Sequence, residues 1–195
     1  MKTPLSKEDV LKLNAGDVVY LTGTVLTARD AAHLRMIEWD GKKQPFPFDL
    51  KNAVIYHCGP VMEASKNGWN AVAAGPTTSD RLTKMTPAVL KYEIRALIGK
   101  GGMENIAGAL RQKCVYLSYT GGCAATAADM IRVSAVYWED LGMPEAVWEL
   151  AVKEFGPLIV GVDAHGNDLF KAVKEKAEAV FRKQFQNKDE ETVSK

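Results

Sequence analysis

The sequence has few cysteines, and no pattern joins them. Cys58, Cys114 and Cys123 are odd in number and show no CxxC spacing. This arrangement argues against a disulfide framework, and against a zinc or iron–sulfur site held by this chain alone. If the protein works with a metal cluster, we expect another chain to hold it.

Long apolar runs and an excess of charge are also missing. The N-terminus, MKTPLSKEDV, has no apolar segment behind its lysine, and no uncharged apolar stretch approaches the roughly 18 residues of a spanning helix. We therefore expect a cytoplasmic protein. Lys and Arg number 25 against 24 Asp and Glu, giving a net charge of +1. Composition thus gives no reason to expect nucleic acid or an anionic membrane as the main partner.

What is present is typical of a globular domain. The chain has 195 residues, of which 47% are apolar and 25% charged. A chain of this length buries roughly 70% of the surface that its unfolded form exposes, so a core forms without disulfides or structural metal. Repeats and low-complexity segments are absent. We expect one domain over residues 1–186 and a polar, disordered tail over 187–195.

Strand and helix signals alternate along the chain, which predicts an α/β fold. The runs rich in β-branched and aromatic residues predict strands over 18–26, 53–58, 69–74, 114–119, 131–138, 145–155 and 158–162. Caps and helical spacing predict helices over 6–15, 27–33, 86–97, 105–112 and 169–181, the last amphipathic and closing the fold. Glycine and proline predict a loop over 39–48.

Three cations lie at the ends of predicted elements. Arg29 follows the first strand, Arg81 follows GPTTSD, and Lys100 lies in the turn GKGG. Loops at strand ends carry ligand groups in α/β folds, and a guanidinium binds a carboxylate through two parallel hydrogen bonds. The trio suits a small dianion. The alternative is a set of surface charges, Arg29 paired with Asp30 and Arg81 with Asp80.

Hydroxyl, imidazole and thiol groups near these cations allow two interpretations. Thr77 and Thr78 are either helix caps or, given an activating partner, a source of a catalytic hydroxyl. His33 and His57 are either acid–base groups or hydrogen-bonded structural residues. Cys58 is more typical of a small buried residue than of a nucleophile. GKGG lacks the rest of a phosphate-binding loop.

Six segments in order carry a family resemblance. They are LTGTVLTARDAAH, YHCGP, AVAAGPTTSDR with the following Met85, IGKGGM, YLSYTGGCAA and LGMPEAVW, spread over residues 15 to 170. Together they resemble the β subunit of class I, iron–sulfur-dependent fumarate hydratase. The same pattern is shared with the β subunit of L(+)-tartrate dehydratase.

The resemblance implies a swivelling β/β/α domain in a two-component hydro-lyase that hydrates fumarate reversibly to (S)-malate. It implies that a [4Fe-4S] cluster is bound by cysteines of a separate α subunit, with no metal ligand in this chain. Matched to the family's motifs, Arg29, Arg81 and Lys100 bind substrate and Thr77 is catalytic. The expected assembly is a hetero-oligomer with the α subunit, and a homodimer of the isolated chain stays open.

Three other functions stay open beside this one. An L(+)-tartrate dehydratase β subunit performs the same elimination on a substrate with a second hydroxyl. A non-catalytic anion-binding or assembly module uses the cations for recognition only, and a stand-alone enzyme uses His57 and Cys58. The aromatic residues Trp39, Phe46 and Phe48 belong either to a surface for the α subunit or to an ordinary core.

Overall fold

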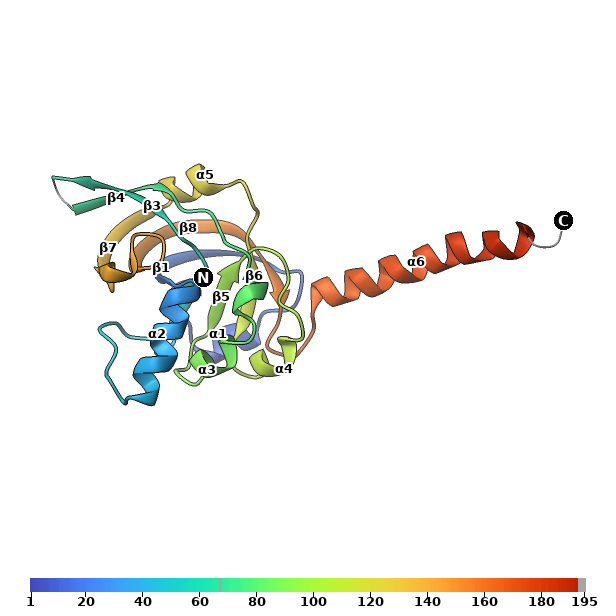
Figure 1. Cartoon of the computed structure of the whole chain (residues 1–195), viewed down its shortest axis with the longest axis horizontal. Helices are drawn as coiled ribbons and strands as arrows, with labels where there is room; N and C mark the ends of the chain where they lie inside the picture. The colour runs from blue at the N-terminus through green and yellow to red at the C-terminus, as the bar shows by residue number, and fades with distance from the viewer. Residues whose placement is uncertain (67, 193–195) are drawn as a thin grey trace.

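The structure, a computed structural model describing residues 1–66 and 68–192, is built around a closed sheet (Figure 1). Within the described residues, neighbouring strands pair in the order β1 (Val18–Thr27), β2 (Val54–Tyr56), β5 (Ala96–Gly99), β6 (Val115–Ser118), β8 (Val147–Val162) and β7 (Ile131–Tyr137). Because β8 also pairs with β1, the strands β1, β2, β5, β6 and β8 close into a barrel-like sheet. This is a mixed α/β fold with a core dominated by the sheet.

The long strand β8 closes the barrel. Its antiparallel register with β1 runs from Val18 opposite Ile159 to Leu26 opposite Glu149. Farther along, Val162 of β8 pairs with Tyr116 of β6. The expected strands 145–155 and 158–162 are therefore one continuous strand of 16 residues.

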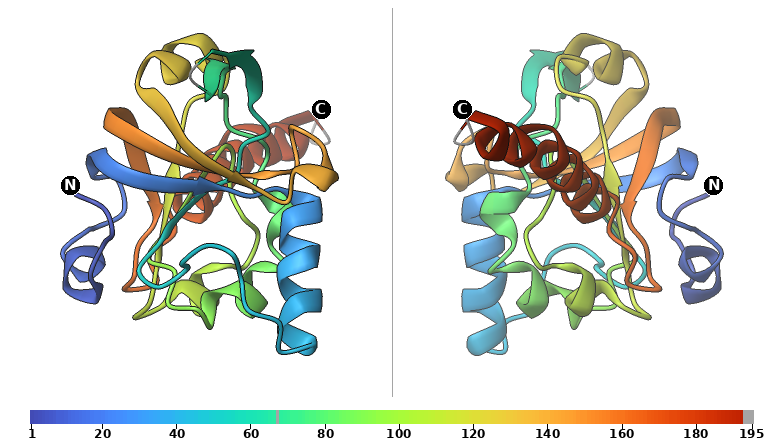
Figure 2. Two further views of the ribbon diagram at one scale, coloured as in Figure 1. Left: turned by 90° about the vertical axis from the view of Figure 1, so that its left-hand side faces the viewer. Right: turned by 90° about the vertical axis from the view of Figure 1, so that its right-hand side faces the viewer.

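Both faces of the short parallel strands are buried, since alternate side chains enter two separate cores. Tyr56, Ile98 and Leu117 belong to one apolar cluster, together with Trp148 and Phe155. Ile55, Leu97 and Tyr116 belong to the other, which α2 (Asp30–Gly41), α3 (Thr86–Leu90) and α4 (Ala107–Leu110) cover (Figure 2). Such strands have no polar face, as is usual for parallel strands covered on both sides.

The remaining elements lie around this body. The expected first helix is α1 (Lys7–Leu11), which begins with a capping box between Ser6 and Asp9. The hairpin of β3 (Val61–Ser65) and β4 (Gly68–Ala73) lies beside α5 (Ala124–Asp129), and two 3₁₀ turns, η1 (Asp80–Leu82) and η2 (Glu139–Leu141), complete the described elements. The sequence did not predict β3 or α5.

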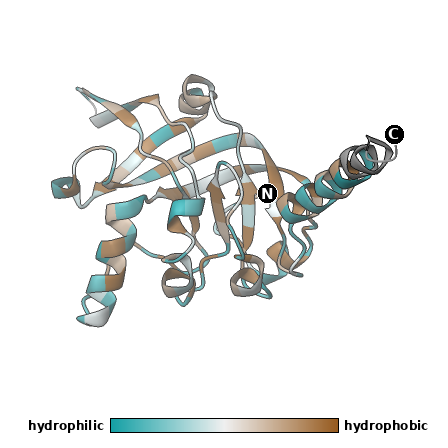
Figure 3. Cartoon of the chain, turned by 45° about the vertical axis from the view of Figure 1, so that its right-hand side comes forward, coloured by the Kyte–Doolittle hydropathy of each residue, from teal (hydrophilic) through white to brown (hydrophobic). Residues whose placement is uncertain are grey.

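Helix α6 (Leu169–Thr192) leaves the body and projects away from it (Figures 1 and 3). Phe170 contacts Tyr116, but residues 171–184 are all exposed. The predicted amphipathic helix exists, but its role in closing the fold is wrong. Residues 193–195 of the expected tail lie outside the described residues. None of the helices in the described part of the chain has the length and apolarity to cross a bilayer.

The expected helix over 86–97 is wrong in its second half. Helix α3 ends at Leu90, Glu93 takes a φ of 61°, and Ala96–Gly99 is the buried strand β5. A strand covered on both faces has no period-2 alternation, so its apolar run resembles a buried helix. The loop predicted over 39–48 begins late, because α2 continues to Gly41.

The aromatic residues of that loop take the core role. Phe48 is 7% exposed, and its ring lies 5.0 Å from that of Trp138, which also packs edge-on against Trp39. Phe46 packs against Phe48 and Tyr92. These aromatic side chains therefore fasten the loop after α2 to the body rather than forming an open apolar face.

Candidate functional site

The predicted site residues lie at one edge of the barrel. Strands β1, β2, β5 and β6 are parallel, so their carboxyl ends meet at the same edge. Arg29 lies two residues after β1, and Lys100 directly follows β5. The segment 76–79 lies between them, through bridges from Pro76 to Cys58 and from Thr78 to Lys100. This edge is where α/β sheets commonly bind ligands.

Backbone hydrogen bonds hold Thr77 between β2 and β5. The Thr77 amide donates to the His57 carbonyl oxygen at 2.7 Å, and its carbonyl accepts from the Lys100 amide at 3.1 Å. The Ser79 amide in turn donates to the Lys100 carbonyl at 3.1 Å. Residues 77–79 thus extend the sheet by a few residues, which fixes the backbone of Thr77 and Lys100 relative to each other.

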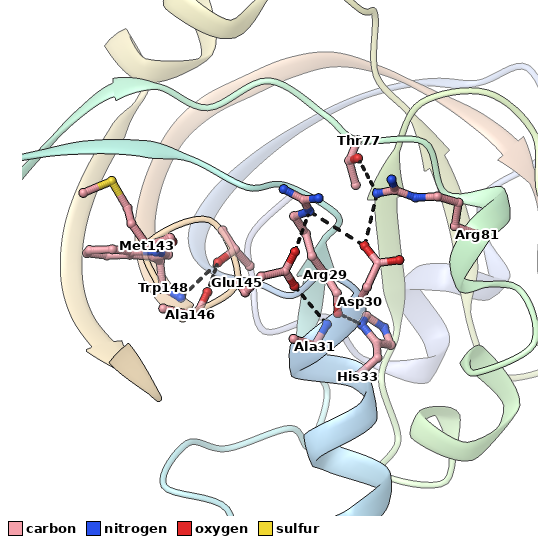
Figure 4. A network of polar contacts seen from close by, with 11 residues as sticks. Arg29, Asp30, Ala31, His33, Thr77, Arg81, Met143, Glu145, Ala146 and Trp148 are labelled. Atoms are coloured by element: carbon pink, nitrogen blue, oxygen red, sulfur yellow. Dashed lines mark hydrogen bonds and ion pairs between the residues drawn. The ribbon is translucent and has the colours of Figure 1, made fainter. Parts of the chain in front are cut away.

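A guanidinium contacts the Thr77 hydroxyl directly. Arg81 Nη2, on η1, donates to Thr77 Oγ1 at 2.9 Å and to Asp30 Oδ2 at 3.1 Å (Figure 4). Asp30 is the first residue of α2 and lies 51 positions away in sequence. Arg81 therefore ties the threonine to the opposite side of the site.

A second arginine is held by a carboxylate from the far side of the chain. Arg29 Nε lies 3.3 Å from Glu145 Oε1 and 3.9 Å from Asp30 Oδ2. The other oxygen of Glu145 accepts from the Ala31 amide at 2.9 Å, so this carboxylate also caps the N-terminus of α2 (Figure 4). The Arg29 carbonyl accepts from the amide and Nδ1 of His33. Backbone and side chain of Arg29 are both fixed.

Gly59 leaves space for the side chain of Arg29. A Cβ built on Gly59 would overlap Nη1 of Arg29 and approach its Cδ to 2.8 Å. The glycine of the YHCGP segment is therefore a close-approach position beside the guanidinium, rather than simple turn punctuation.

Lys100 differs from the two arginines in its charge balance. Arg29 faces Glu145 and Arg81 faces Asp30, whereas Lys100 makes no ion pair with any carboxylate of the described residues. Its stem passes Gly121 of the TGGC turn. The three cations and two carboxylates leave a local excess of positive charge, which suits an anion.

The buried histidines and cysteines do not reach the site surface. His33 and His57 have 0% exposure, and burial lowers the pKa of each imidazole, which keeps both neutral. Burial likewise raises the pKa of the Cys58 thiol to about 12. Burial of His57 and Cys58, with 0% and 1% exposure, does not favour a stand-alone enzyme built on these two groups.

Neither threonine caps a helix. Ser79 is the N-cap of η1, and its side chain makes no cap hydrogen bond. Thr78 is exposed, and its backbone bridges to Lys100. The helix-cap interpretation of Thr77 and Thr78 is therefore wrong.

The described part of the chain offers no fit for an iron–sulfur cluster. Among the described residues no three His, Cys, Asp or Glu side chains gather as metal ligands. Cluster ligands are thiolates, whereas burial raises the pKa of Cys58 and Cys114 well above the ordinary thiol value and keeps them protonated. These residues therefore provide no ligand set for a cluster.

The structure brings three of the four predicted site residues into one polar network. Thr77, Arg81 and Arg29 are linked through Asp30, while Lys100 joins them through the backbone. Sequence reasoning missed Glu145, although its segment LGMPEAVW was part of the resemblance. No local pattern could place it, since its partners lie more than 100 residues away.

Comparison with known proteins gives a consistent result. A family model described as Fumarase C-terminus matches residues 1–173. A protein of Methanocaldococcus jannaschii, provisionally named L(+)-tartrate dehydratase subunit beta, is 48% identical over 177 residues, covering 88% of this chain and 91% of that protein. The L(+)-tartrate dehydratase subunit beta of Escherichia coli K12 is 40% identical over 87% of this chain and 85% of its own length.

A third relative is much longer than this chain. It is a Geobacillus stearothermophilus protein provisionally named fumarate hydratase class I, 41% identical over 179 residues. The match covers 89% of this chain but only 34% of that protein. The domain described here thus also occurs as one third of a larger single chain.

Proposed function

The chain belongs to the fumarase C-terminus family, and from that premise we propose that it is the β subunit of a two-component hydro-lyase. Its proposed reaction is the reversible hydration of fumarate to (S)-malate. The E. coli relative carries the word subunit in its name, which supports a separate α subunit as partner. We place the assembled enzyme in the cytoplasm.

The observation that carries this proposal is the hydrogen bond from Arg81 to Thr77 Oγ1 at 2.9 Å. A threonine hydroxyl is a weak base and needs a group that stabilises negative charge on its oxygen. The positively charged Arg81 guanidinium is such a group. Because it donates to Thr77 Oγ1, the hydroxyl's own proton is free to point elsewhere. In the hydration direction the Thr77 hydroxyl gives this proton to carbon 3, Arg81 stabilises the alkoxide that is left, and the proton released by the added water restores the hydroxyl; dehydration runs in reverse.

The cations bind the two carboxylates of the substrate. The positive charge of Arg29, Arg81 and Lys100 exceeds the negative charge of Asp30 and Glu145, so a dianion is attracted to this edge. During elimination, charge grows on the carboxylate next to the carbon that loses its proton. Fixed cations stabilise that charge, and losing one preorganised donor of this kind costs roughly 2.7 to 4 kcal/mol.

The partner provides what this chain does not. We propose that its cysteines hold the [4Fe-4S] cluster, a Lewis acid that polarises the substrate's hydroxyl and carboxylate. We further propose that this chain swivels over the partner to enclose the substrate, as its resemblance to swivelling β/β/α domains implies. The residues of this chain bind the dianion and move one proton.

A second candidate substrate is L(+)-tartrate. Two relatives that match this chain over most of their length are named as tartrate dehydratase β subunits, which favours it specifically. Tartrate and malate share the two carboxylates and the eliminated hydroxyl, so the same cations and threonine serve both. Only the contacts to the second hydroxyl differ.

The decisive experiment uses the chain co-purified anaerobically with its α subunit. We expect hydration of fumarate or dehydration of L(+)-tartrate, and neither from this chain alone. Thr77→Val removes the hydroxyl at nearly constant volume and should lower kcat by about 10²- to 10⁴-fold. Thr78→Val is the matched control, since this neighbouring threonine is exposed and should keep kcat within about twofold.

Two results would contradict the proposal. Full kcat in Thr77→Val at saturating substrate, with weaker binding only, would favour a non-catalytic anion-binding or assembly module. Turnover by this chain without the α subunit would contradict the division of labour.

A further inference from the structure

Beneath Thr77 and Lys100 lies a row of buried polar side chains that the proposed chemistry does not use. His57 and Ser79 have 0% exposure, and His57 Nδ1 lies 2.8 Å from Ser79 Oγ. The Tyr116 hydroxyl lies 3.1 Å from Ser79 Oγ and 2.7 Å from the Gly101 carbonyl oxygen. Buried polar groups of this kind are costly unless each has a partner.

Counting protons gives this row a direction. The Gly101 carbonyl can only accept, so the single hydroxyl proton of Tyr116 goes to it. Ser79 must then donate to Tyr116 across the 3.1 Å contact, and Ser79 has no second proton to give. His57 Nδ1 therefore donates to Ser79. The chain runs His57 to Ser79 to Tyr116 to Gly101, with His57 in its Nδ1–H form.

Every member of the chain also touches the backbone that carries Thr77 and Lys100. The His57 carbonyl accepts from the Thr77 amide, and the Ser79 amide donates to the Lys100 carbonyl. Tyr116 holds the next carbonyl, that of Gly101. The carbonyl groups of Lys100 and Gly101 are thereby fixed to the barrel.

The Ser79 hydroxyl is tightly packed against Gly99. A Cβ built on Gly99 would overlap Ser79 Oγ and lie 3.2 Å from His57 Nδ1. Gly99, in the IGKGGM segment, is therefore the residue that lets Ser79 turn inward instead of capping η1. Removing the serine hydroxyl would leave a buried donor on His57 without an acceptor, which favours a rearrangement of segment 77–79.

We propose that His57, Ser79 and Tyr116 are positioning residues, a directional hydrogen-bond chain that sets Thr77 and Lys100 in place for the reaction. This inference rests on the proposed function. It assigns to the buried histidine a role in holding the catalytic segment, without contact to the substrate. The geometry required for reaction is narrow, and a misplacement of about 1 Å can cost about 10²-fold in rate.

The direction of the hydrogen-bond chain is tested by ¹⁵N NMR of the protein labelled at histidine. There are three histidines, and His165, which is exposed, serves as the reference. We expect His57 with a protonated Nδ1 and an unprotonated Nε2, and a change of this pattern in Ser79→Ala. An Nε2–H form of His57 in the unmodified protein would overturn the proposal.

The positioning role is tested on the assembled α and β enzyme. Ser79→Ala and His57→Leu should each lower kcat/KM by about 10- to 100-fold. Tyr116→Phe, which removes a single oxygen, should have an effect in the same direction. His57→Asn keeps an N–H donor at the position of Nδ1 and should recover most of the loss. Tyr137→Phe is the matched control, because that hydroxyl, on β7, bonds the Glu149 carboxylate of β8 at 2.9 Å.

The outcomes separate the two proposals. An unmodified assembly that turns over neither dicarboxylate contradicts the proposed function itself. An active assembly in which Ser79→Ala, Tyr116→Phe and His57→Leu all keep kcat/KM within twofold contradicts only the positioning role. Equal losses in His57→Asn and His57→Leu would also overturn it, since the donor would then be irrelevant.

Discussion

The carboxyl edge of the barrel and the projecting helix α6 are opposite kinds of structure. At the edge, Thr77 and Lys100 are held by backbone bonds on both sides, with a buried hydrogen-bond chain beneath them. Along α6, Val173 is 60% exposed and Val180 is 48% exposed, and no residue from 171 to 184 is buried. A change at the edge must disturb several neighbours, whereas a change on α6 disturbs almost none.

This contrast has a functional meaning. The cations and the threonine come from segments that the barrel has already fixed, so binding a dianion costs little ordering of the chain. Helix α6 contributes nothing to that order beyond its first turn. Four substitutions, from the edge outward to α6, test how steeply the effect of a substitution on the unfolding free energy falls.

The largest effect is expected from Gly99→Ala. A methyl group would overlap the Ser79 hydroxyl and crowd His57, so the strand end or segment 77–79 must move. We expect a loss of about 3 kcal/mol in the free energy of unfolding, measured with urea. Gly108→Ala is the control, because nothing lies within 4 Å of its Cβ and α4 should gain up to about 1 kcal/mol. Equal stabilities for the two variants would contradict the contrast.

A smaller effect is expected from Asp163→Asn, just beyond β8. Asp163 accepts hydrogen bonds from the amides of Ala15, His165 and Asn167 and from the Asn167 side chain. Burial alone would raise the pKa of Asp163, but these hydrogen bonds outweigh it and hold the pKa below its ordinary value. The asparagine variant should lose about 2 kcal/mol at pH 7.

The pH dependence of that loss follows from the lowered pKa. A carboxyl whose folded pKa is depressed contributes stability above its unfolded pKa of about 3.9, and the contribution disappears as pH falls through the folded pKa. Thermal unfolding of both proteins from pH 7 to pH 3 should therefore show a converging Tm. Parallel curves would mean that the ionised carboxylate is not the stabilising form.

Arg35→Lys should have an effect of about 1 kcal/mol. Arg35 binds Asp140 with two hydrogen bonds, of 2.7 and 2.6 Å, and its guanidinium lies 5.5 Å from the centre of the Trp138 ring. A lysine ammonium can neither make the two parallel hydrogen bonds to Asp140 nor stack on the Trp138 ring as the planar guanidinium does. Lys42→Gln, which breaks the exposed ion pair with Glu38 at the end of α2, is the reference and should change the unfolding free energy less than Arg35→Lys does. Chemical denaturation distinguishes the two.

The smallest effect is expected on α6. Val180→Ser replaces an exposed apolar side chain and should change the unfolding free energy of this chain by less than about 0.5 kcal/mol. Leu21→Ser, at a fully buried position of β1, is the contrasting variant and should cost several kcal/mol. A large loss at Val180 would show that α6 packs against the body in solution.

The sequence predicted the strands with local signals and failed where burial depends on distant partners. The segments predicted as strands over 18–26 and 114–119 carry β-branched and aromatic residues and form β1 (Val18–Thr27) and β6 (Val115–Ser118). Residues 96–99 carry the same apolar character and form β5, but the helix predicted from Thr86–Pro87 runs on to residue 97. The spacing of Val173, Ala177 and Val180 predicted a packed helix, and spacing alone does not say whether a partner surface exists.

The site shows the same limit. The places of Arg29, Arg81 and Lys100 at the ends of predicted elements pointed to a site, and a resemblance assigned their roles and that of Thr77. Their convergence follows from parallel strands whose ends share one edge. Ser79 turns inward because Gly99 leaves space for its hydroxyl. Glu145 reaches α2 across 114 positions. Such partners are set by the closure of the barrel, which no local pattern encodes.

The strand β8 also governs the order in which this molecule can form. Its pairing with β1 joins Val18 to Ile159, so the two ends of the chain must meet before the barrel exists. Pairings of such long range are slow, because the loop-closure entropy is lost before the contacts form. A ribosome must release residue 162 before the last pair with β6 can form. Until then β1 and β6 each have an edge without its β8 partner, which is the stage of synthesis most exposed to aggregation.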